Sequence, residues 1–258
     1  MRVKKLPAFL ILLVSLGLGG YGLHMMYNQM FKTDGDTIVD DSGKSISAVT
    51  ELSNDSKNVK LDKSKGKNES SKIQFAKNNL ADCYTRSKKA SNNVIGWLYI
   101  DGTAVNYPVM SGQDNNYWLT RSWTGKPSAN GSIFLDESEY TFGSEDLIHG
   151  HNMANGSMFA SLRRFKDREF FNTGHLVYLY DGSQTRVYKV FSVFLVPQTF
   201  SFKVNISDRE GIKSYAKELY DKSMYKTVHP SDSDLLILNT CVSDGTNRHQ
   251  ITVAQRIN

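Results

Sequence analysis

A succession of short apolar runs, each bounded by turn residues, limits this chain to a mainly β fold. Three such stretches are "VIGWLYIDGTAVNYPVM", "GSIFLD" and "HLVYLYDGSQTRVYKVFSVFLV", and two more, "DLLILNTC" and "RHQITVAQRI", lie at the end of the chain. The dipeptides Asp101-Gly102 and Asp181-Gly182 interrupt two of them, and Asp-Gly pairs favour tight hairpin turns. Seven or eight short strands with few helices predict a closed or nearly closed β-barrel.

Helical patterns occur at three places in the chain. Apolar residues recur at helical spacing in residues 72–90 and in residues 208–224. Ser207 and Glu210 form a capping-box pattern at the start of the second segment. A third helical stretch, "GSMFASLRRF", follows His151. The sequence therefore predicts a barrel with an N-terminal helix, short helices and one helix inserted before the strand that carries the second cysteine.

The N-terminus has the pattern of a membrane anchor. Residues 6–23 contain no charged side chain and follow the basic stretch "MRVKK". A helix that rises about 1.5 Å per residue over this length nearly crosses a hydrocarbon core of about 30 Å. We expect residues 1–5 to be cytoplasmic and residues 6–26 to form a single transmembrane signal anchor, because flanking positive charges stay inside. The alternative is a cleaved signal peptide, but its apolar region is normally shorter and a small-residue cleavage site is missing here.

Residues 27–71 are expected to form a flexible stalk. From Thr33 to Ser71 the chain is rich in Asp, Ser, Lys and Asn and has no aromatic residue. Such a segment buries too little apolar surface to offset the entropy lost on ordering. The folded domain is therefore predicted at residues 72–258, outside the cytoplasm.

Charge and cysteine content exclude several classes of function. The chain has 31 Lys and Arg against 26 Asp and Glu, a net charge of +5, and the basic residues are spread along the sequence. No basic helix with interleaved aromatic residues is present, so we expect no nucleic acid partner. Two cysteines without a CxxC pattern make neither a disulfide framework nor a zinc site, and we expect no metal and no cofactor.

The two cysteines differ in their surroundings. Cys83 falls on the apolar face of the first predicted helix, where a small buried hydrophobe is expected. Cys241 follows the run "LLIL" and precedes the polar loop "VSDGTN". A strand exit can hold a nucleophile rigidly while leaving it reachable, although a cysteine at the end of a core strand fits the position equally well.

Candidate partners for the Cys241 thiol are a histidine and an arginine. His149 and His151 flank Gly150 in "LIHGHNMANGSMF", and they lack a third ligand at a spacing typical of metal sites. A Cys–His pair brought together by the fold is the better interpretation. Arg248 begins the last strand, and if the two final strands are neighbours its guanidinium can return beside the thiol and stabilise an oxyanion. A surface arginine at a strand start is the alternative.

Taken in order, these motifs resemble those of the sortase family. "LNTC" followed by Arg248 is similar to the TLxTC…R signature, with Leu238 and Thr240 matching and Ile237 in place of the first Thr. "GHNM" resembles the family's catalytic histidine segment. "NNVIGWLYIDGTAVNYPVMSGQDNNYWL" and "GSIFLD" resemble class B sortases in particular, as does the helix predicted before the cysteine strand. The resemblance covers roughly Ile73 to the C-terminus.

This resemblance implies an eight-stranded sortase barrel on the outer face of a Gram-positive cell membrane. Sortases are transpeptidases, and the matching positions imply that Cys241 attacks the Thr carbonyl of a C-terminal sorting signal on a secreted protein. His151 would act as general acid and then base, and Arg248 would steady the substrate and the oxyanion. The signal would be NPQTN or [NS]PxTG-like, and an amine of a peptidoglycan precursor would resolve the thioester. Asn115 and Leu119, spaced i and i+4 on one helix face, are expected to line the substrate pocket.

Some positions depart from the family pattern or leave alternatives open. His149 stands where class B sortases commonly have a Tyr that is associated with the substrate pocket. Asn239 holds the variable position before Thr-Cys, and we include both residues among the candidate substrate-binding residues. Asp244 is the one candidate for an acidic residue near the cysteine. The same residues would also suit a thiol hydrolase that uses water as acceptor, and a non-catalytic module that binds the cell wall is a third hypothesis.

Overall fold

The computed structural model describes residues 79–111, 114–203, 206, 208–227 and 229–258. Within these ranges, no helix combines the length and the apolar character that a membrane crossing requires. The predicted cytoplasmic end at residues 1–5, the anchor at residues 6–26 and the stalk at residues 27–71 lie outside the described residues, as do residues 72–78 of the predicted domain.

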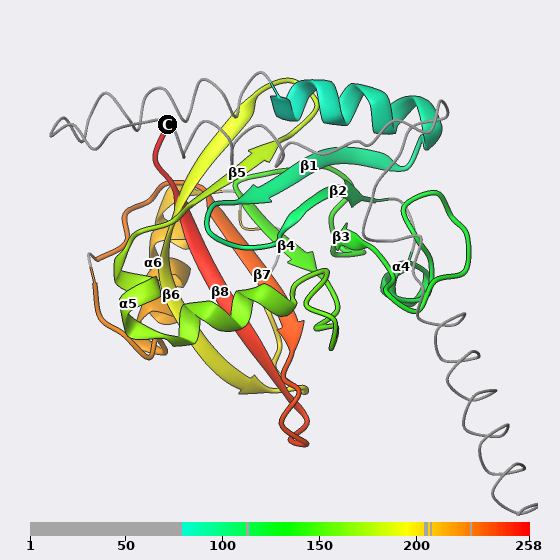
Figure 1. The fold of residues 1–258 in the computed structure, drawn as a ribbon. Coiled ribbons are helices and arrows are strands. Elements are labelled where there is room, and N and C mark those ends of the chain that lie inside the picture. Colours follow the sequence, from blue (N-terminus) through cyan, green and yellow to red (C-terminus); the bar gives the residue numbers. More distant parts are fainter. Residues whose placement is uncertain (1–78, 112–113, 204–205, 207, 228) are drawn as a thin grey trace, which may run out of the picture. The chain divides into compact units, whose positions relative to one another are not determined.

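Eight strands form a closed barrel, which confirms the predicted fold (Figure 1). Their order around the barrel is β1-β2-β3-β4-β7-β8-β6-β5. Two neighbouring pairs, β2 with β3 and β4 with β7, are parallel, and the others are antiparallel. The strands are β1 (Val94–Ile100), β2 (Asn106–Met110), β3 (Ile133–Leu135), β4 (Glu145–His149), β5 (Leu176–Tyr180), β6 (Thr185–Pro197), β7 (Leu235–Cys241) and β8 (Arg248–Arg256).

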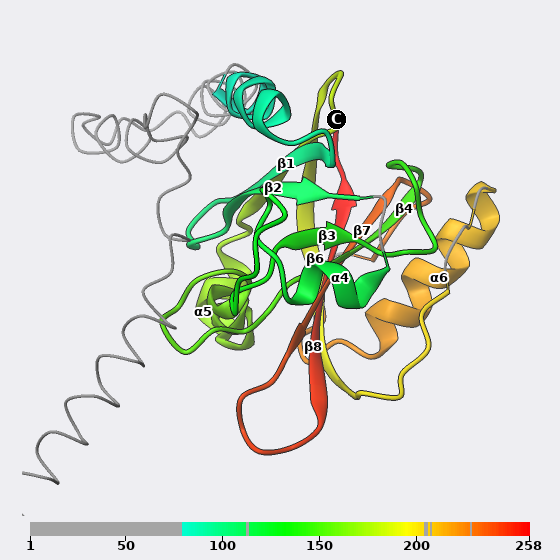
Figure 2. The same cartoon turned by 90° about the vertical axis from the view of Figure 1, so that its right-hand side faces the viewer.

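The apolar run of β7 is explained by burial on both faces of the sheet. Leu236 and Leu238 point into the barrel, where they belong to its main core. Leu235 and Ile237 alternate with them and pack outside against the helix α6 (Arg209–Asp221). Figure 2 shows α6 on the outside of the barrel. A strand that is covered on both faces has a continuous apolar sequence instead of an alternating one. The packing on both faces also holds β7 in place up to its exit.

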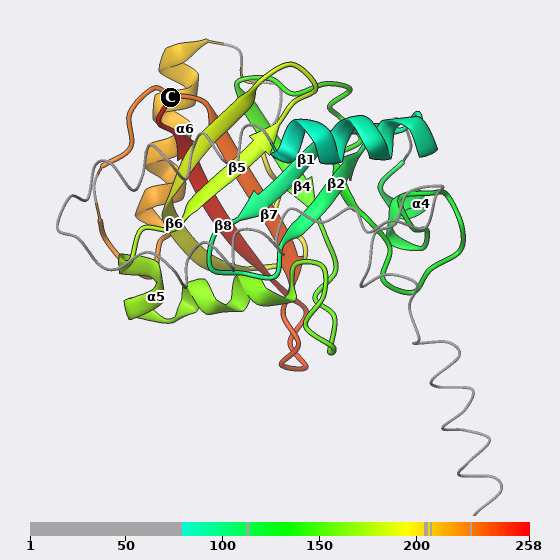
Figure 3. The ribbon, with the colours of Figure 1, turned by 45° about the horizontal axis from the view of Figure 1, so that its top comes forward.

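The helices confirm the predicted positions with local differences. Residues 79–90 are helical, with Leu80 and Cys83 buried against β1, β5 and β6, and this helix lies across the barrel in Figures 1 and 3. The cap of α6 is Asp208, whose carboxylate accepts a hydrogen bond from Gly211 N at 2.7 Å. The predicted capping box of Ser207 and Glu210 was therefore wrong, because the helix begins one residue later than that pattern requires.

Three shorter helices surround the barrel. In the predicted helical stretch "GSMFASLRRF", the residues from Ala160 onward belong to the 3-10 helix η1, and the four residues before it are not helical. Both α4 and α5 begin at an Asp whose carboxylate accepts a backbone N–H, as expected at a helix N-terminus. Their bounds are η1 (Ala160–Lys166), α4 (Asn115–Leu119) and α5 (Arg168–Asn172).

Candidate active site

Cys241 is the last residue of β7 and is exposed, at the point where the chain leaves the barrel. The loop of residues 242–247 then projects beyond the barrel and returns as β8 (Figures 1 and 2). Backbone pairing with β4 on one side and β8 on the other holds β7 in place. Partial burial raises the pKa of the Cys241 thiol above its ordinary value. The side chain is therefore a rigidly mounted, reachable thiol that needs help to ionise.

The segment that contains His151 is fastened alongside the end of β7. Gly150 N donates to Asn239 O at 3.2 Å, and Thr240 Oγ1 donates to Gly150 O at 2.8 Å. Asn152 Nδ2 donates to Cys241 O at 2.9 Å. These bonds extend the parallel β4–β7 pairing past the ends of the strands. They place the backbone of His151 directly beside that of the cysteine.

The imidazole of His151 is held from the other side. Its Nε2 lies 2.8 Å from the backbone oxygen of Leu119. A carbonyl oxygen only accepts, so Nε2 carries the donated proton and Nδ1 is the nitrogen left for chemistry. Leu119 thus takes part in the site through its main chain, at the end of α4.

Arg248 is bound within its own loop. Its Nη2 donates to Asp244 Oδ2 at 2.7 Å and its Nε donates to Thr246 Oγ1 at 2.8 Å. Hydrogen bonds from Thr246 and Arg248 lower the pKa of Asp244 to about 2. The sequence spacing predicted that Arg248 could lie beside the thiol. In the structure, the register of β7 and β8 places Arg248 opposite the loop residue Val242.

The residue opposite Cys241 in that register is His249, which sequence reasoning placed in a strand without assigning it a role. Its Nε2 lies 3.8 Å from Cys241 Sγ. Burial, followed by the electrostatic effect of the nearby His149, lowers the pKa of His249 below its ordinary value. Because successive side chains of a strand point to opposite faces, His249 shares a face with Cys241 and Arg248 does not.

Three of the four candidate substrate-binding residues, Asn115, His149 and Asn239, form one hydrogen-bonded network with Asp136, which sequence analysis missed. The fourth, Leu119, contacts His151 instead. Asp136 Oδ2 lies 2.8 Å from His149 Nε2 and accepts from Asn115 Nδ2 at 2.9 Å. On its other side, His149 Nδ1 accepts from Asn239 Nδ2 at 3.0 Å. The network joins α4, β4 and β7. An acidic residue after the strand "IFL" was the only sequence signal for it.

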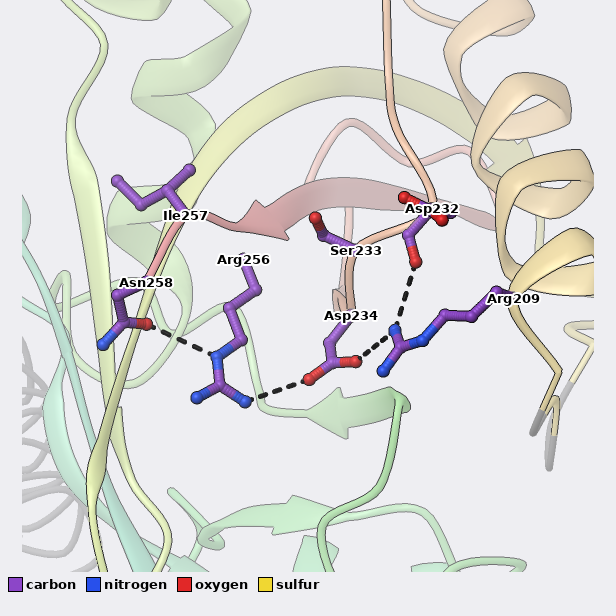
Figure 4. Close-up of a pocket in the computed structure, with 7 residues that line it drawn as sticks. All are labelled: Arg209, Asp232, Ser233, Asp234, Arg256, Ile257 and Asn258. Carbon is purple, nitrogen blue, oxygen red and sulfur yellow. Dashed lines mark hydrogen bonds and ion pairs between the residues drawn. The ribbon is translucent and has the colours of Figure 1, made fainter.

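A cavity of about 520 Å³ lies at the opposite end of β7 and β8 (Figure 4). Asp234, just before β7, accepts from Arg209 at 2.7 Å and from Arg256 at 3.1 Å, so both guanidinium groups of its wall are paired with the same carboxylate. The seven residues of β7 separate it from Cys241 by about 20 Å. It therefore contributes nothing to the thiol chemistry. Among the described residues, no cluster of three His, Cys, Asp or Glu side chains is arranged to hold a metal ion.

Comparison with known proteins gives a consistent result. The model of the Sortase domain family matches residues 98–257, more than half of the chain. Sortase B of Listeria monocytogenes is 29% identical over 160 residues, and sortase B of Staphylococcus aureus is 24% identical over 163 residues. Each match covers 60% of this chain and 65% of the relative, so the chain spans less than two thirds of the length of these curated relatives.

Solved structures of similar proteins share the barrel. A mutant form of Clostridium perfringens sortase B superposes with a TM-score of 0.64 at 28% identity, over 70% of this chain and 89% of that one. Bacillus anthracis sortase B in complex with AAEK1 gives a TM-score of 0.61 at 27% identity, over 68% of this chain and 84% of that one.

Proposed function

This chain belongs to the sortase family, and within it to class B, and we propose that it is a cysteine transpeptidase. In the proposed reaction the thiolate of Cys241 attacks the carbonyl carbon of a Thr in a sorting signal. A thioester bond forms, the C–N bond after the Thr breaks, and the departing amine takes the Nδ1 proton of His151, which enters the reaction as the imidazolium. A second amine then attacks the thioester, loses a proton to His151 and leaves with the acyl group in a new amide bond.

The observation that carries this proposal is the position of Cys241 beside residues 150–152. The thiol stands at the exit of β7. The neighbouring segment is held by a hydrogen bond that Thr240 Oγ1 donates to Gly150 O and by one that Asn152 Nδ2 donates to Cys241 O. The nucleophile thus ends β7, and the acid–base group lies two residues after the end of the adjacent parallel strand β4, so rigid elements preorganise the reaction. The exposure of Cys241 leaves room for a peptide carbonyl.

Arg248 is proposed to bind the substrate and the oxyanion. A guanidinium fork suits a developing negative oxygen, and Arg248 is the first residue of β8, next to His249, which is paired with Cys241. Its side chain has to leave Asp244 for this role, because the two are joined at 2.7 Å in the free chain. Substrate binding is the step at which we expect that exchange.

The proposed substrates are secreted proteins that carry a C-terminal signal of the NPQTN or [NS]PxTG-like type. The proposed acceptor is an amine of a peptidoglycan precursor. The connected set of His149, Asn239 and Asn115 around Asp136, with Leu119 against His151, supports assigning these residues to the wall of the substrate groove. A solved neighbour, Staphylococcus aureus sortase B, is described as a substrate complex.

The proposed location is the outer face of the cell membrane. The uncharged stretch of residues 6–23 after the basic N-terminus supports a single membrane anchor with the N-terminus inside. The polar composition of residues 27–71 supports a stalk that carries the catalytic domain outward.

The test uses the full chain with fluorogenic peptides that contain the candidate signals, in the presence and absence of a glycine-peptide amine. We expect a thioester adduct on Cys241 by intact mass, and an amide product whose amount rises with amine concentration. Cys241→Ala is expected to abolish both while its thermal unfolding stays close to that of the wild type. Retained adduct formation in this variant would refute the proposal. Hydrolysed peptide at every amine concentration would identify a thiol hydrolase.

A further inference from the structure

We propose that His249, rather than His151, accepts the proton of the Cys241 thiol when the thiolate forms. This inference rests on the proposed transpeptidase function for its chemical context. It assigns His249 as a further catalytic residue, and it leaves His151 as the group that exchanges protons with the leaving and incoming amines.

The backbone register brings the two reacting atoms together. β7 and β8 pair without a shift from Leu235 opposite Gln255 to Cys241 opposite His249. Residues directly opposite in an antiparallel pair have Cβ atoms about 5 Å apart, so their contact follows from the sheet itself. The distance of 3.8 Å from Cys241 Sγ to His249 Nε2 lies within the range of hydrogen bonds to sulfur.

The other two candidate partners of the thiol, His151 and Arg248, are hydrogen-bonded to other groups in the free chain. His151 uses its Nε2 at the backbone oxygen of Leu119, and Arg248 is bonded to Asp244. Within the described part of the chain, the contact with His249 is the one hydrogen bond of Cys241 Sγ. Among the described residues, His249 Nε2 is therefore the acceptor that the thiol contacts within hydrogen-bonding distance.

Electrostatics favour a neutral resting pair. Burial and the nearby His149 of β4 lower the pKa of His249, and burial raises the pKa of Cys241. On its other side His249 is paired with Val196 of β6, which carries no charge. At neutral pH the imidazole nitrogen is thus free to accept, and the thiol still has its proton to give.

The proton transfers balance over one cycle. The cycle begins with a neutral thiol, a neutral His249 and His151 as the imidazolium, which carries its second proton on Nδ1. The thiol proton moves to His249 Nε2, and the thiolate forms the S–C bond while the departing amine takes the Nδ1 proton of His151. In the second half, the incoming amine gives a proton to His151, the S–C bond breaks, and the sulfur recovers its proton from His249. Both imidazoles and the thiol end in the protonation states in which they began.

The test measures the rate of Cys241 alkylation by iodoacetamide in the full chain as a function of pH, with the site verified by peptide mass. A thiol that shares its proton with an imidazole keeps a constant thiolate fraction between the two pKa values, because the transfer does not change the number of bound protons. We expect a plateau in the wild type. In His249→Gln the rate should instead rise about tenfold per pH unit below the pKa of the thiol. Acylation by a sorting-signal peptide should slow about 100-fold.

Two further measurements control for folding and for proximity. His249→Asn should repeat the result of His249→Gln, with thermal unfolding recorded for both. The matched control is His229→Gln, an exposed imidazole against Tyr220, which should keep the plateau. The inference would be overturned if the plateau persisted in His249→Gln or disappeared only in His151→Gln. It would also be overturned if the wild type showed no plateau. A wild-type plateau without any peptide conversion would refute the transpeptidase function and leave this inference intact.

Discussion

His149 Nε2 lies 2.8 Å from the carboxylate oxygen Oδ2 of Asp136, and both side chains are largely buried. With Asn239 donating to Nδ1, the proton on Nε2 is the one shared with Asp136. The imidazole also stacks on Phe134 at a centroid distance of 5.3 Å. The residue that departs from the class B pattern is therefore the bridge between β7, β4 and the loop after β3.

We expect His149→Phe to lower the free energy of unfolding by about 1–3 kcal/mol. A phenyl ring keeps the stacking on Phe134 but removes both hydrogen bonds, which leaves the half-buried Asp136 carboxylate with fewer donors. Urea unfolding measures the change. In an Asp136→Asn background the same substitution should cost clearly less, because the charged partner is already absent. Equal costs in the two backgrounds would contradict a direct interaction.

The contribution of Asp136 to stability should depend on pH. Burial by itself raises the pKa of Asp136, but hydrogen bonds from His149, Ser138 and Asn115 outweigh it and hold the pKa well below its usual range. A carboxylate whose pKa is lower in the folded state stabilises the fold above its unfolded pKa of about 3.9, and this stabilisation is lost as the pH falls toward the folded value. The stability difference between wild type and Asp136→Asn should therefore be largest near pH 6 and shrink below pH 4. A difference that stays constant over this interval would show that the hydrogen bonds do not favour the charged form.

We expect the pairing of Arg248 with Asp244 to compete with substrate. The pKa of Asp244, lowered to about 2, keeps its carboxylate charged at every pH relevant to activity, so protonation of Asp244 does not release the guanidinium in that range. Asp244→Asn should lower KM for a sorting-signal peptide. Arg248→Lys keeps the charge but loses the fork, and it should reduce kcat/KM by about 100-fold. Steady-state kinetics measure both effects, and an Arg248→Lys variant within twofold of the wild type would exclude the proposed oxyanion role.

The two thiols should differ sharply in reactivity. Burial, reinforced by the charge of Asp82, raises the pKa of Cys83 to about 12, and its side chain is enclosed beneath the helix of residues 79–90. Cys241 is exposed. At neutral pH a thiol reagent should modify one cysteine per folded chain, located at Cys241 by peptide mass, and two per chain in denaturant. Modification of Cys83 at a comparable rate in the folded chain would show that this helix opens.

Periodicity predicted the strands and the main helices because each buries a regular face. The run before Cys241 indicated a buried strand, and its exit was a sound place to look for a nucleophile. β4 was harder to recognise, since Glu145 and Asp146 are charged residues at buried positions. Pattern alone marked "LIH" as a short apolar stub.

Side-chain partners depended on register, which one sequence does not contain. A shift of one residue between two strands exchanges the faces of all their side chains. A shift of one residue decides whether Arg248 or His249 faces Cys241, and the length of the loop between the two strands is compatible with either arrangement. The contact of His149 with Asp136 joins separate strands in the same way, and nothing local to either residue indicates it.

Gly150 is expected to be essential although it carries no side chain. A Cβ at this position would lie 2.4 Å from Ile133 Cδ1 and 2.8 Å from Phe159 Cδ2, both within the barrel core. Gly150→Ala should therefore displace the segment that carries His151, lower the free energy of unfolding by about 1–3 kcal/mol and reduce kcat with every catalytic side chain still present. Gly143→Ala is the matched control, because a Cβ there would meet only a backbone oxygen at 4.0 Å. Urea unfolding and peptide turnover distinguish the two variants, and a Gly150→Ala enzyme with wild-type kcat would show that the position of His151 tolerates this displacement.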